Sequence, residues 1–411
     1  MDEFVPELRD MIERSRSNEI ELAITNPCFE AWLSMHVDSS AAKLDRHQRG
    51  IAACRYAPAD SAEDGALIGR RPVFATVERG HQEDPMAVNF TDMPLELLHE
   101  YRPELREPEG LDAFWADTLA EARAVARPAT LAPAAGPVRA LSVQDLTFTG
   151  FAGDEIRGWV VRPHGDAPLP AVVEFIGYGG GRGLAGDKIA WAAAGYVHVV
   201  MDTRGQGSGW SIGDTPDPHG SAAAHPGVMT RGIRDPRDYY YRRLYTDAAC
   251  LIDVVRELPG VDATRIAVTG GSQGGALAIA AAALSGDAVA ALMPDVPFLC
   301  DIPNAIVRTP SPPFTEITRW LSIHRDDTAA ALHTLSHIDG AILARRITAP
   351  AFFSVALMDD IVLPSGVFAA FHALASEDAA IEVYPYNGHE GGGTRHWARQ
   401  VAWLDTRFGL S

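Results

Sequence analysis

Short apolar runs alternate with longer stretches of helical spacing from residue 140 onward. The pattern predicts strands at 142–149, 156–162, 171–176, 196–201, 266–269, 288–293, 351–356 and 380–384. It predicts helices near 186–194, 243–258, 273–285, 365–376 and 394–407. Central runs such as Val197–Met201 are almost continuously apolar, as in parallel strands covered on both faces, whereas the first two strands alternate more and are expected at an antiparallel edge. The pattern therefore predicts an α/β fold with a mostly parallel central sheet flanked by helices.

Residues 1–88 lack this alternation. Within them the charged stretch Glu3–Glu21 has the spacing of an amphipathic helix, and 56–85 has the composition of a loop. We interpret 1–88 as an N-terminal extension of unclear role and 89–411 as the main domain.

The start of the main domain contains one further helical pattern. Apolar residues at helical spacing predict a helix at about 109–126. The Pro- and Ala-rich stretch 126–138 follows it, and this composition predicts an extended connector to the strand-rich region.

Composition and charge narrow the class of protein. The chain has 411 residues, 47% of them hydrophobic and 22% charged, and its formal net charge is −19. Such acidity disfavours nonspecific binding to nucleic acid or anionic membranes, so neither is expected as a partner. The four cysteines form no C-x-x-C pair, and no apolar run reaches the ~18 residues of a membrane span. The N-terminus lacks the features of a signal peptide, so we expect a cytoplasmic protein. A metal or cofactor is not expected either.

A nucleophile elbow is the most specific motif. The β-branched run Ile266–Thr269 leads directly into Gly270-Gly271-Ser272-Gln273-Gly274, and an alanine-rich helix follows. In a G-x-S-x-G elbow the chain turns so sharply from strand to helix that only small residues fit around the serine, and the turn exposes its hydroxyl. An ordinary glycine-rich turn is the alternative, but the flanking strand and helix favour the elbow.

A serine nucleophile needs a histidine base and an acid that orients the histidine. In this fold the acid and then the histidine follow later strands. Asp359 and Asp360 come directly after the strand 351–356, and His389 comes after the strand 380–384. Only one of the two adjacent aspartates can point at the histidine, and spacing does not decide which. Four other histidines fall in helical contexts and are expected to be surface or packing residues: His333, His337, His372 and His396.

The developing oxyanion needs two backbone N–H donors. One should come from Gln273, and the other from the glycine-rich loop 177–183 after the strand 171–176. Gly181, Gly183 and Gly186 also match the G-x-G-x-x-G spacing of a dinucleotide-binding loop, with Asp202 at the end of the next strand. That alternative is weaker because the first of these glycines lies well past the strand end.

With these motifs placed, residues 89–411 resemble carbohydrate esterase family seven, the acetyl xylan esterases and cephalosporin C deacetylases. The resemblance rests on Arg204-Gly205-Gln206, on Gly270–Gly275 and on His389-Glu390. Further family-like segments are Met93–Leu98, Tyr101–Pro103, Phe114-Trp115, Met229–Ile233 and Tyr239–Arg243.

The resemblance implies an α/β-hydrolase fold and a serine esterase that removes acetyl groups from small sugar esters or cephalosporin C-like esters. It implies Ser272 as nucleophile, His389 as base and Asp359 as orienting acid, with oxyanion donors from Tyr178 and Gln273. Arg204 would be structural, together with Gln206 and Glu390 of the same motifs. Members of the family are usually hexamers, so a homo-oligomer is expected.

Two departures from the family pattern affect the acyl pocket rather than the triad. The oxyanion loop reads Ile176–Gly180 where the family often has His-Gly-Tyr-Asn-Gly, and Val362–Pro364 stands where it often has Cys-Pro-Pro. In the extension, Thr25–Leu33 resembles a short segment of RloB-like proteins, for which a gene-fusion or start-site remnant is the simpler explanation.

Two other hypotheses remain from the sequence. One is a hydrolase of the same fold with another leaving group, such as a peptidase or a lactone hydrolase. The other is a binding protein that uses the hydrolase fold as a scaffold, which the presence of all three triad residues disfavours.

Overall fold

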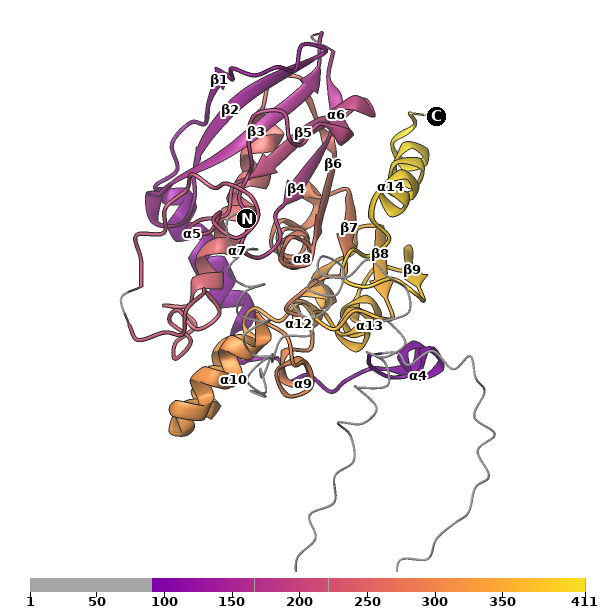
Figure 1. The fold of residues 1–411 in the computed structure, drawn as a ribbon. Coiled ribbons are helices and arrows are strands. Elements are labelled where there is room, and N and C mark those ends of the chain that lie inside the picture. The colour runs from indigo at the N-terminus through magenta and orange to yellow at the C-terminus, as the bar shows by residue number, and fades with distance from the viewer. Residues whose placement is uncertain (1–90, 166, 221, 411) are drawn as a thin grey trace, which may run out of the picture. The chain divides into compact units, whose positions relative to one another are not determined.

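The computed structural model describes residues 91–165, 167–220 and 222–410 (Figure 1). The expectations for the N-terminal extension, including the helix at Glu3–Glu21, the loop at 56–85 and the RloB-like segment, lie outside the described residues. The described residues all belong to the main domain.

A single nine-stranded sheet forms the centre of the domain, in the order β1-β2-β3-β5-β4-β6-β7-β8-β9. Its strands are β1 (Thr130–Pro133), β2 (Leu141–Thr149), β3 (Glu155–Pro163), β4 (Leu169–Phe175), β5 (Val197–Met201), β6 (Val261–Gly271), β7 (Ala291–Asp295), β8 (Ala351–Ala356) and β9 (Ala379–Tyr384). β1, β2, β3 and β5 pair antiparallel, and the remaining neighbours pair parallel. The predicted mostly parallel sheet with an antiparallel edge is confirmed.

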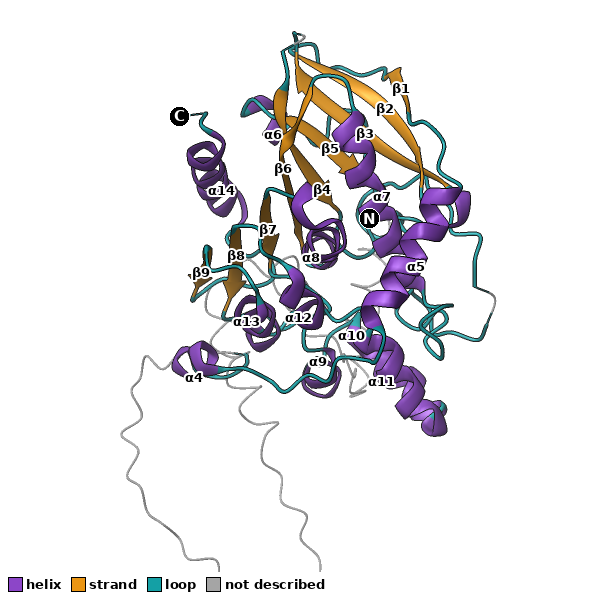
Figure 2. Cartoon of the chain, turned by 180° about the vertical axis from the view of Figure 1, so that it is seen from behind, coloured by secondary structure: helices purple, strands orange, loops and turns teal. Residues whose placement is uncertain are grey.

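Helices cover both faces of the sheet (Figures 1 and 2). They are α4 (Leu95–Glu100), α5 (Leu111–Ala124), α6 (Ala190–Ala193), α7 (Tyr240–Glu257), α8 (Gln273–Ser285), α9 (Ile302–Arg308), α10 (Phe314–Ile323), α11 (Thr328–Ser336), α12 (Gly340–Leu343), α13 (Pro364–Ala373) and α14 (Gly393–Phe408). α6 and α14 pack on one face, where Trp191 and Leu404 share a buried cluster with Val172 and Met293 of the sheet. α7, α8 and α13 contribute to the larger core on the opposite face. This is the two-sided cover that continuously apolar strands require.

Three elements differ from the sequence pattern. The stretch predicted as a connector contains β1, whose Thr130–Pro133 pairs with β2; a proline is tolerated there because β1 is an edge strand. The helix expected at 186–194 is only the four residues of α6. β7 begins at Ala291 rather than at 288 because Gly286–Ala288 forms a 3-10 turn.

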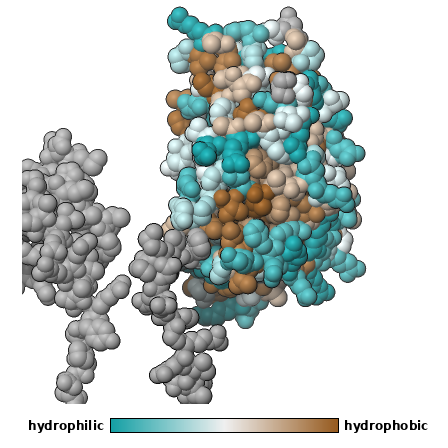
Figure 3. All heavy atoms as spheres, turned by 90° about the vertical axis from the view of Figure 1, so that its right-hand side faces the viewer, coloured by the Kyte–Doolittle hydropathy of each residue, from teal (hydrophilic) through white to brown (hydrophobic). Residues whose placement is uncertain are grey.

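The surface carries apolar as well as polar side chains. Figure 3 shows the face at the right-hand side of Figure 1, where hydrophobic residues form separate patches below the middle and near the upper end, with hydrophilic residues between them. Trp210 is 60% exposed, and Val307 and Ile323 at the ends of α9 and α10 are also exposed. Apolar atoms make up much of the surface of folded proteins generally, so these residues do not by themselves identify an interface.

A buried arginine ties three segments of the domain together. Arg204, in the loop after β5, has no exposed surface and binds the carboxylate of Asp247 in α7 through Nε and Nη2. Its Nη1 donates to Asp154 at 2.9 Å and lies 3.4 Å from Asp217. Burial raises the pKa of Asp247, and the charge of Arg204 opposes that shift. The arginine therefore provides a charged partner for a buried carboxylate while it fixes the loop.

We expect Arg204→Ala to reduce the free energy of unfolding by about 3–5 kcal/mol, because it leaves the buried carboxylate of Asp247 without its charged partner. The matched control is Arg123→Ala, which removes a half-exposed arginine paired with Asp253 at 2.8 Å and should have an effect below about 1 kcal/mol. Urea denaturation followed by circular dichroism measures both. Equal effects of the two substitutions would contradict the structural importance of Arg204.

Candidate active site

Ser272 lies on a strained turn between β6 and α8. Its backbone has φ 58° and ψ −118°, a conformation that costs about 1–3 kcal/mol for a non-glycine residue. The flanking glycines are required by close packing: a Cβ at Gly274 would lie 2.2 Å from the carbonyl oxygen of Phe175, and one at Gly270 would lie 2.5 Å from the carbonyl carbon of Gly274. The turn thus has the geometry of a nucleophile elbow.

His389 and Asp359 come together from the loops after β9 and β8. Nδ1 of His389 lies 2.8 Å from Oδ2 of Asp359, whose side chain has no exposed surface. Oδ1 of Asp359 accepts the backbone N–H groups of Ile361 and Val362, each at 2.9 Å. Asp360 is exposed, and its backbone carbonyl accepts from the Thr309 hydroxyl at 2.7 Å. Of the two aspartates that spacing could not separate, the structure places Asp359 beside the histidine.

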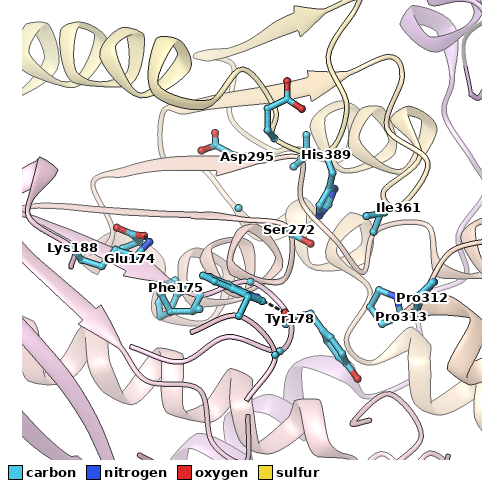
Figure 4. A pocket seen from close by; sticks show the side chains of 18 residues that line it. Glu174, Phe175, Tyr178, Lys188, Ser272, Asp295, Pro312, Pro313, Ile361 and His389 are labelled. Atoms are coloured by element: carbon cyan, nitrogen blue, oxygen red, sulfur yellow. Dashed lines mark hydrogen bonds and ion pairs between the residues drawn. The ribbon is translucent and has the colours of Figure 1, made fainter. Parts of the chain in front are cut away.

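Ser272 and His389 line one pocket of about 760 Å³. In Figure 4 the imidazole of His389 is turned toward the hydroxyl of Ser272. Other lining residues are Glu174, Phe175, Ile176, Gly177, Tyr178, Gly179, Lys188, Gly209, Trp210, Gly271, Asp295, Val296, Pro312, Pro313, Ile361 and Glu390. The pocket is large enough for a small ligand beside the serine.

Two backbone N–H groups, those of Gln273 and Tyr178, have no hydrogen-bond acceptor among the described residues. The N–H of Gln273 is the first of α8, so it has no partner within the helix. The N–H of Tyr178 donates no hydrogen bond to any residue in the described part of the chain. The sequence and the family resemblance predicted these two groups as oxyanion donors, and that role stays a prediction.

Gln206 connects the two segments that carry these donors. Its Oε1 accepts the backbone N–H of Gly179 at 2.6 Å, and its Nε2 donates to Oε1 of Gln273 at 2.9 Å. The Gln273 amide in turn donates to the carbonyl of Ile176 at 3.2 Å. The distance between the loop at Tyr178 and the elbow is therefore fixed by side-chain amides.

The side chain of Tyr178 is held by a residue that sequence reasoning missed. Its hydroxyl donates to Glu316 of α10 at 2.7 Å and accepts the N–H of Val228 at 2.8 Å. Burial and the nearby carboxylate raise the pKa of Tyr178 well above its usual value, so the hydroxyl stays protonated. The sequence did contain a signal for this contact: Glu316 lies between Phe314 and Ile317, on the buried, otherwise apolar face of α10.

Glu390 braces the loop that carries His389. Its carboxylate accepts from the side-chain amide of Asn387 and from the backbone N–H of Gly388 at 3.1 Å. The hydrogen bond from Asn387 lowers the pKa of Glu390. Glu390 is thus a positioning residue of the histidine loop.

The carboxylate that a dinucleotide site would need is already occupied. Asp202 is fully buried, and its Oδ1 accepts the N–H groups of Arg182 and Thr203. Its Oδ2 accepts those of Asp214 and Thr215. Neither oxygen is free to bind a ribose hydroxyl, so the geometry argues against dinucleotide binding.

The described ranges contain neither a metal-binding cluster nor a helix that could span a membrane. No group of three or more His, Cys, Asp or Glu side chains there is arranged to hold a metal ion. The helices of the described part of the chain are all too short or too polar to cross a membrane.

The sheet, the elbow and the loops that meet at it define an α/β-hydrolase. The model of the acetyl xylan esterase (AXE1) family matches residues 88–407. The chain belongs to this family of carboxylic ester hydrolases, as the resemblance predicted. The matched region begins at residue 88, so it gives no support to the RloB-like interpretation of Thr25–Leu33.

Individual relatives agree with this assignment. Acetyl esterase Axe7A of Xylanibacter ruminicola is 23% identical over 91% of this chain and 90% of its own length. Among solved structures, an acetyl xylan esterase from Paenibacillus sp. R4 is 35% identical with a TM-score of 0.72, and acetyl xylan esterase 1 from Thermoanaerobacterium sp. JW/SL YS485 is 33% identical with a TM-score of 0.70. Each alignment covers 76% of this chain and 99% of the other.

We expect Gln206→Leu to lower kcat for an acetyl ester about tenfold while KM changes less than about twofold, because the variant misplaces an oxyanion donor without removing it. The control is Gln144→Leu, which makes the same change in β2, between β1 and β3 and away from the pocket. Steady-state kinetics of both variants provide the measurement. A Gln206→Leu enzyme with the kcat of the wild type would show that the amide bridge does not position the donors.

Proposed function

We propose that this member of the acetyl xylan esterase family hydrolyses acetyl esters of small substrates through an acyl-enzyme on Ser272. The single observation that carries the proposal is the 2.8 Å contact between His389 Nδ1 and Asp359 Oδ2 at the pocket that also holds the elbow serine. The contact leaves Nε2 of the imidazole to face the serine hydroxyl. This is the arrangement that a serine nucleophile requires.

In the proposed mechanism His389 takes the proton of Ser272 as the hydroxyl oxygen attacks the acetyl carbonyl. The backbone N–H groups of Tyr178 and Gln273 stabilise the tetrahedral oxyanion, and one such donor contributes on the order of 10²–10³ in rate. His389 then gives its proton to the departing alcohol, which leaves an acetylated serine. Water attacks this ester with His389 again as base, and acetate is released.

The proposed substrates are acetylated xylo-oligosaccharides and cephalosporin C-like esters. The names of the similar structures from Paenibacillus and Thermoanaerobacterium support the first of these. The pocket volume of about 760 Å³ is compatible with a small sugar ester. A homo-oligomer, by family resemblance a hexamer, and a cytoplasmic location stay predictions, and sedimentation of the purified protein would test the first.

The proposal predicts that Ser272→Ala abolishes the hydrolysis of p-nitrophenyl acetate. Wild type should cleave the acetate faster than the butyrate and the octanoate, and Ser272→Ala should cleave none above background. An aminoacyl p-nitroanilide and a lactone in the same assay test the peptidase and lactone hydrolase alternatives. A folded wild type that cleaves no ester and does not react with a fluorophosphonate probe would instead support a binding protein.

The two adjacent aspartates provide a matched pair for the acid. Asp359→Asn should lower kcat about 10³–10⁴-fold, because the amide favours the wrong tautomer of His389. Asp360→Asn makes the same change one residue away on an exposed side chain and should leave kcat within about twofold. Circular dichroism of both variants confirms folding, and comparable losses in kcat would exclude Asp359 as the orienting acid.

A further inference from the structure

The side of the pocket between β4 and β7 is lined with ionisable groups that the mechanism does not use. Glu174 on β4 and Asp295 at the end of β7 both line the pocket, together with Lys188 (Figure 4). Glu390 lines it on the histidine side. What these groups do depends on which of their charges are already compensated within the protein.

Lys188, the lysine in the described part of the pocket lining, already forms an ion pair with Glu174. Lys188 Nζ lies 2.5 Å from Oε1 of Glu174, and the other oxygen of Glu174 lies 2.8 Å from Nε2 of the buried His198. Burial opposes ionisation of Glu174, but the hydrogen bond to His198 and the charge of Lys188 outweigh it and lower its pKa to about 2. The Glu174–Lys188 pair is therefore neutral as a unit and offers no free positive charge to a ligand.

Asp295 keeps one carboxylate oxygen without a partner among the described residues. Its Oδ1 accepts from the Gln400 amide at 2.8 Å and from Ser354 at 3.3 Å, and lies 3.1 Å from Nε2 of His396. Its Oδ2 makes no hydrogen bond or ion pair within the described ranges, and the side chain is 27% exposed. The backbone carbonyl of Asp295 accepts the N–H of Ser272 at 2.9 Å, so this carboxylate lies next to the elbow.

The charges of the pocket therefore do not balance. Within the described part of the chain, no lysine or arginine of the lining compensates Asp295 or Glu390, because Lys188 is bound to Glu174. A negatively charged ligand would be brought close to two carboxylates in a partly desolvated pocket, where like charges repel strongly. The overall charge of −19 adds a repulsive field of the same sign at longer range.

We propose that Asp295 and Glu390 make the site selective for acetyl esters of neutral or cationic alcohols and unfavourable for alcohols that carry a carboxylate or sulfonate. This inference rests on the proposed function, since it concerns the alcohol part of the ester that Ser272 would cleave. Hydroxyl groups of a neutral polyol can donate to Oδ2 of Asp295, and an ammonium group can pair with it. A carboxylate can do neither. Among the proposed substrates, a neutral acetylated sugar is favoured over the anionic cephalosporin C.

Three small acetyl esters of similar length test the selectivity. Acetylcholine is cationic, 3,3-dimethylbutyl acetate is its uncharged counterpart of the same shape, and 4-acetoxybutanoate is anionic. Burial raises the pKa of Asp295, so the assay uses a pH-stat at about pH 8 to favour the ionised carboxylate. At low salt we expect kcat/KM of the anionic ester to be about tenfold below that of the neutral ester, and that of acetylcholine to equal or exceed the neutral value. Added salt should reduce the difference.

Charge-neutralising variants identify the groups responsible. Asp295→Asn keeps the shape of the side chain and should raise the ratio of anionic to neutral kcat/KM severalfold. Glu174→Gln frees Lys188 and should raise the same ratio, which provides a second route if Asp295→Asn does not fold. Asp360→Asn removes an exposed carboxylate that does not line the pocket, and it should leave the ratio unchanged.

The outcomes separate this inference from the proposed function. If wild type cleaves p-nitrophenyl acetate in a Ser272-dependent way but hydrolyses the anionic ester as fast as the neutral one at low salt, the charge selectivity is wrong and the esterase stands. If the ratio is low but neither pocket variant moves it, the charge of Asp295 is not its source and the proposed basis of the selectivity is wrong. If no ester is cleaved, the proposed function is wrong, and the proposed charge selectivity is wrong as well.

Discussion

The turn at Ser272 is the constraint on which the rest of the site depends. A non-glycine residue at positive φ is held there because β6 enters the turn with its backbone against Phe175 and α8 leaves it through glycines with no room for a side chain. Folding of the parallel sheet around this point stabilises the strained turn. Once the turn is fixed, the Ser272 hydroxyl and the N–H of Gln273 have defined directions, and the other groups need only approach them.

Different kinds of interaction bring the other groups to that point. Two backbone N–H groups donate to the carboxylate of Asp359 and fix its position. The same carboxylate orients the ring of His389. Side-chain amides join the Tyr178 loop to the elbow through Gln206 and Gln273. The buried Arg204 then holds the loop that carries Gln206 against α7. Each contact acts over a few ångströms, yet together they span most of the width of the sheet.

Much of this arrangement could be predicted from the sequence because it depends on the pattern of residues within single segments of the chain. The apolar runs identified eight of the nine strands, and the elbow and the residues after β8 and β9 are signalled by spacing along single segments. β1 was missed because a four-residue edge strand with a proline has the composition of a connector. Glu316 and Asp295 were missed because their importance lies in contacts with Tyr178 and Ser272, which are distant in sequence or visible only once the sheet is formed.

The separation of the site residues along the chain has a consequence for how the protein matures. Tyr178, Gln206, Ser272, Asp359 and His389 belong to five segments, and the contact of Asp359 with His389 requires β8 and β9 to pair in parallel across a connecting helix. Parallel pairing closes long loops and is therefore slow compared with helix formation. A refolding chain can thus acquire its helices early and still lack a complete site, so recovery of enzymatic activity reports the last steps of assembly rather than the first.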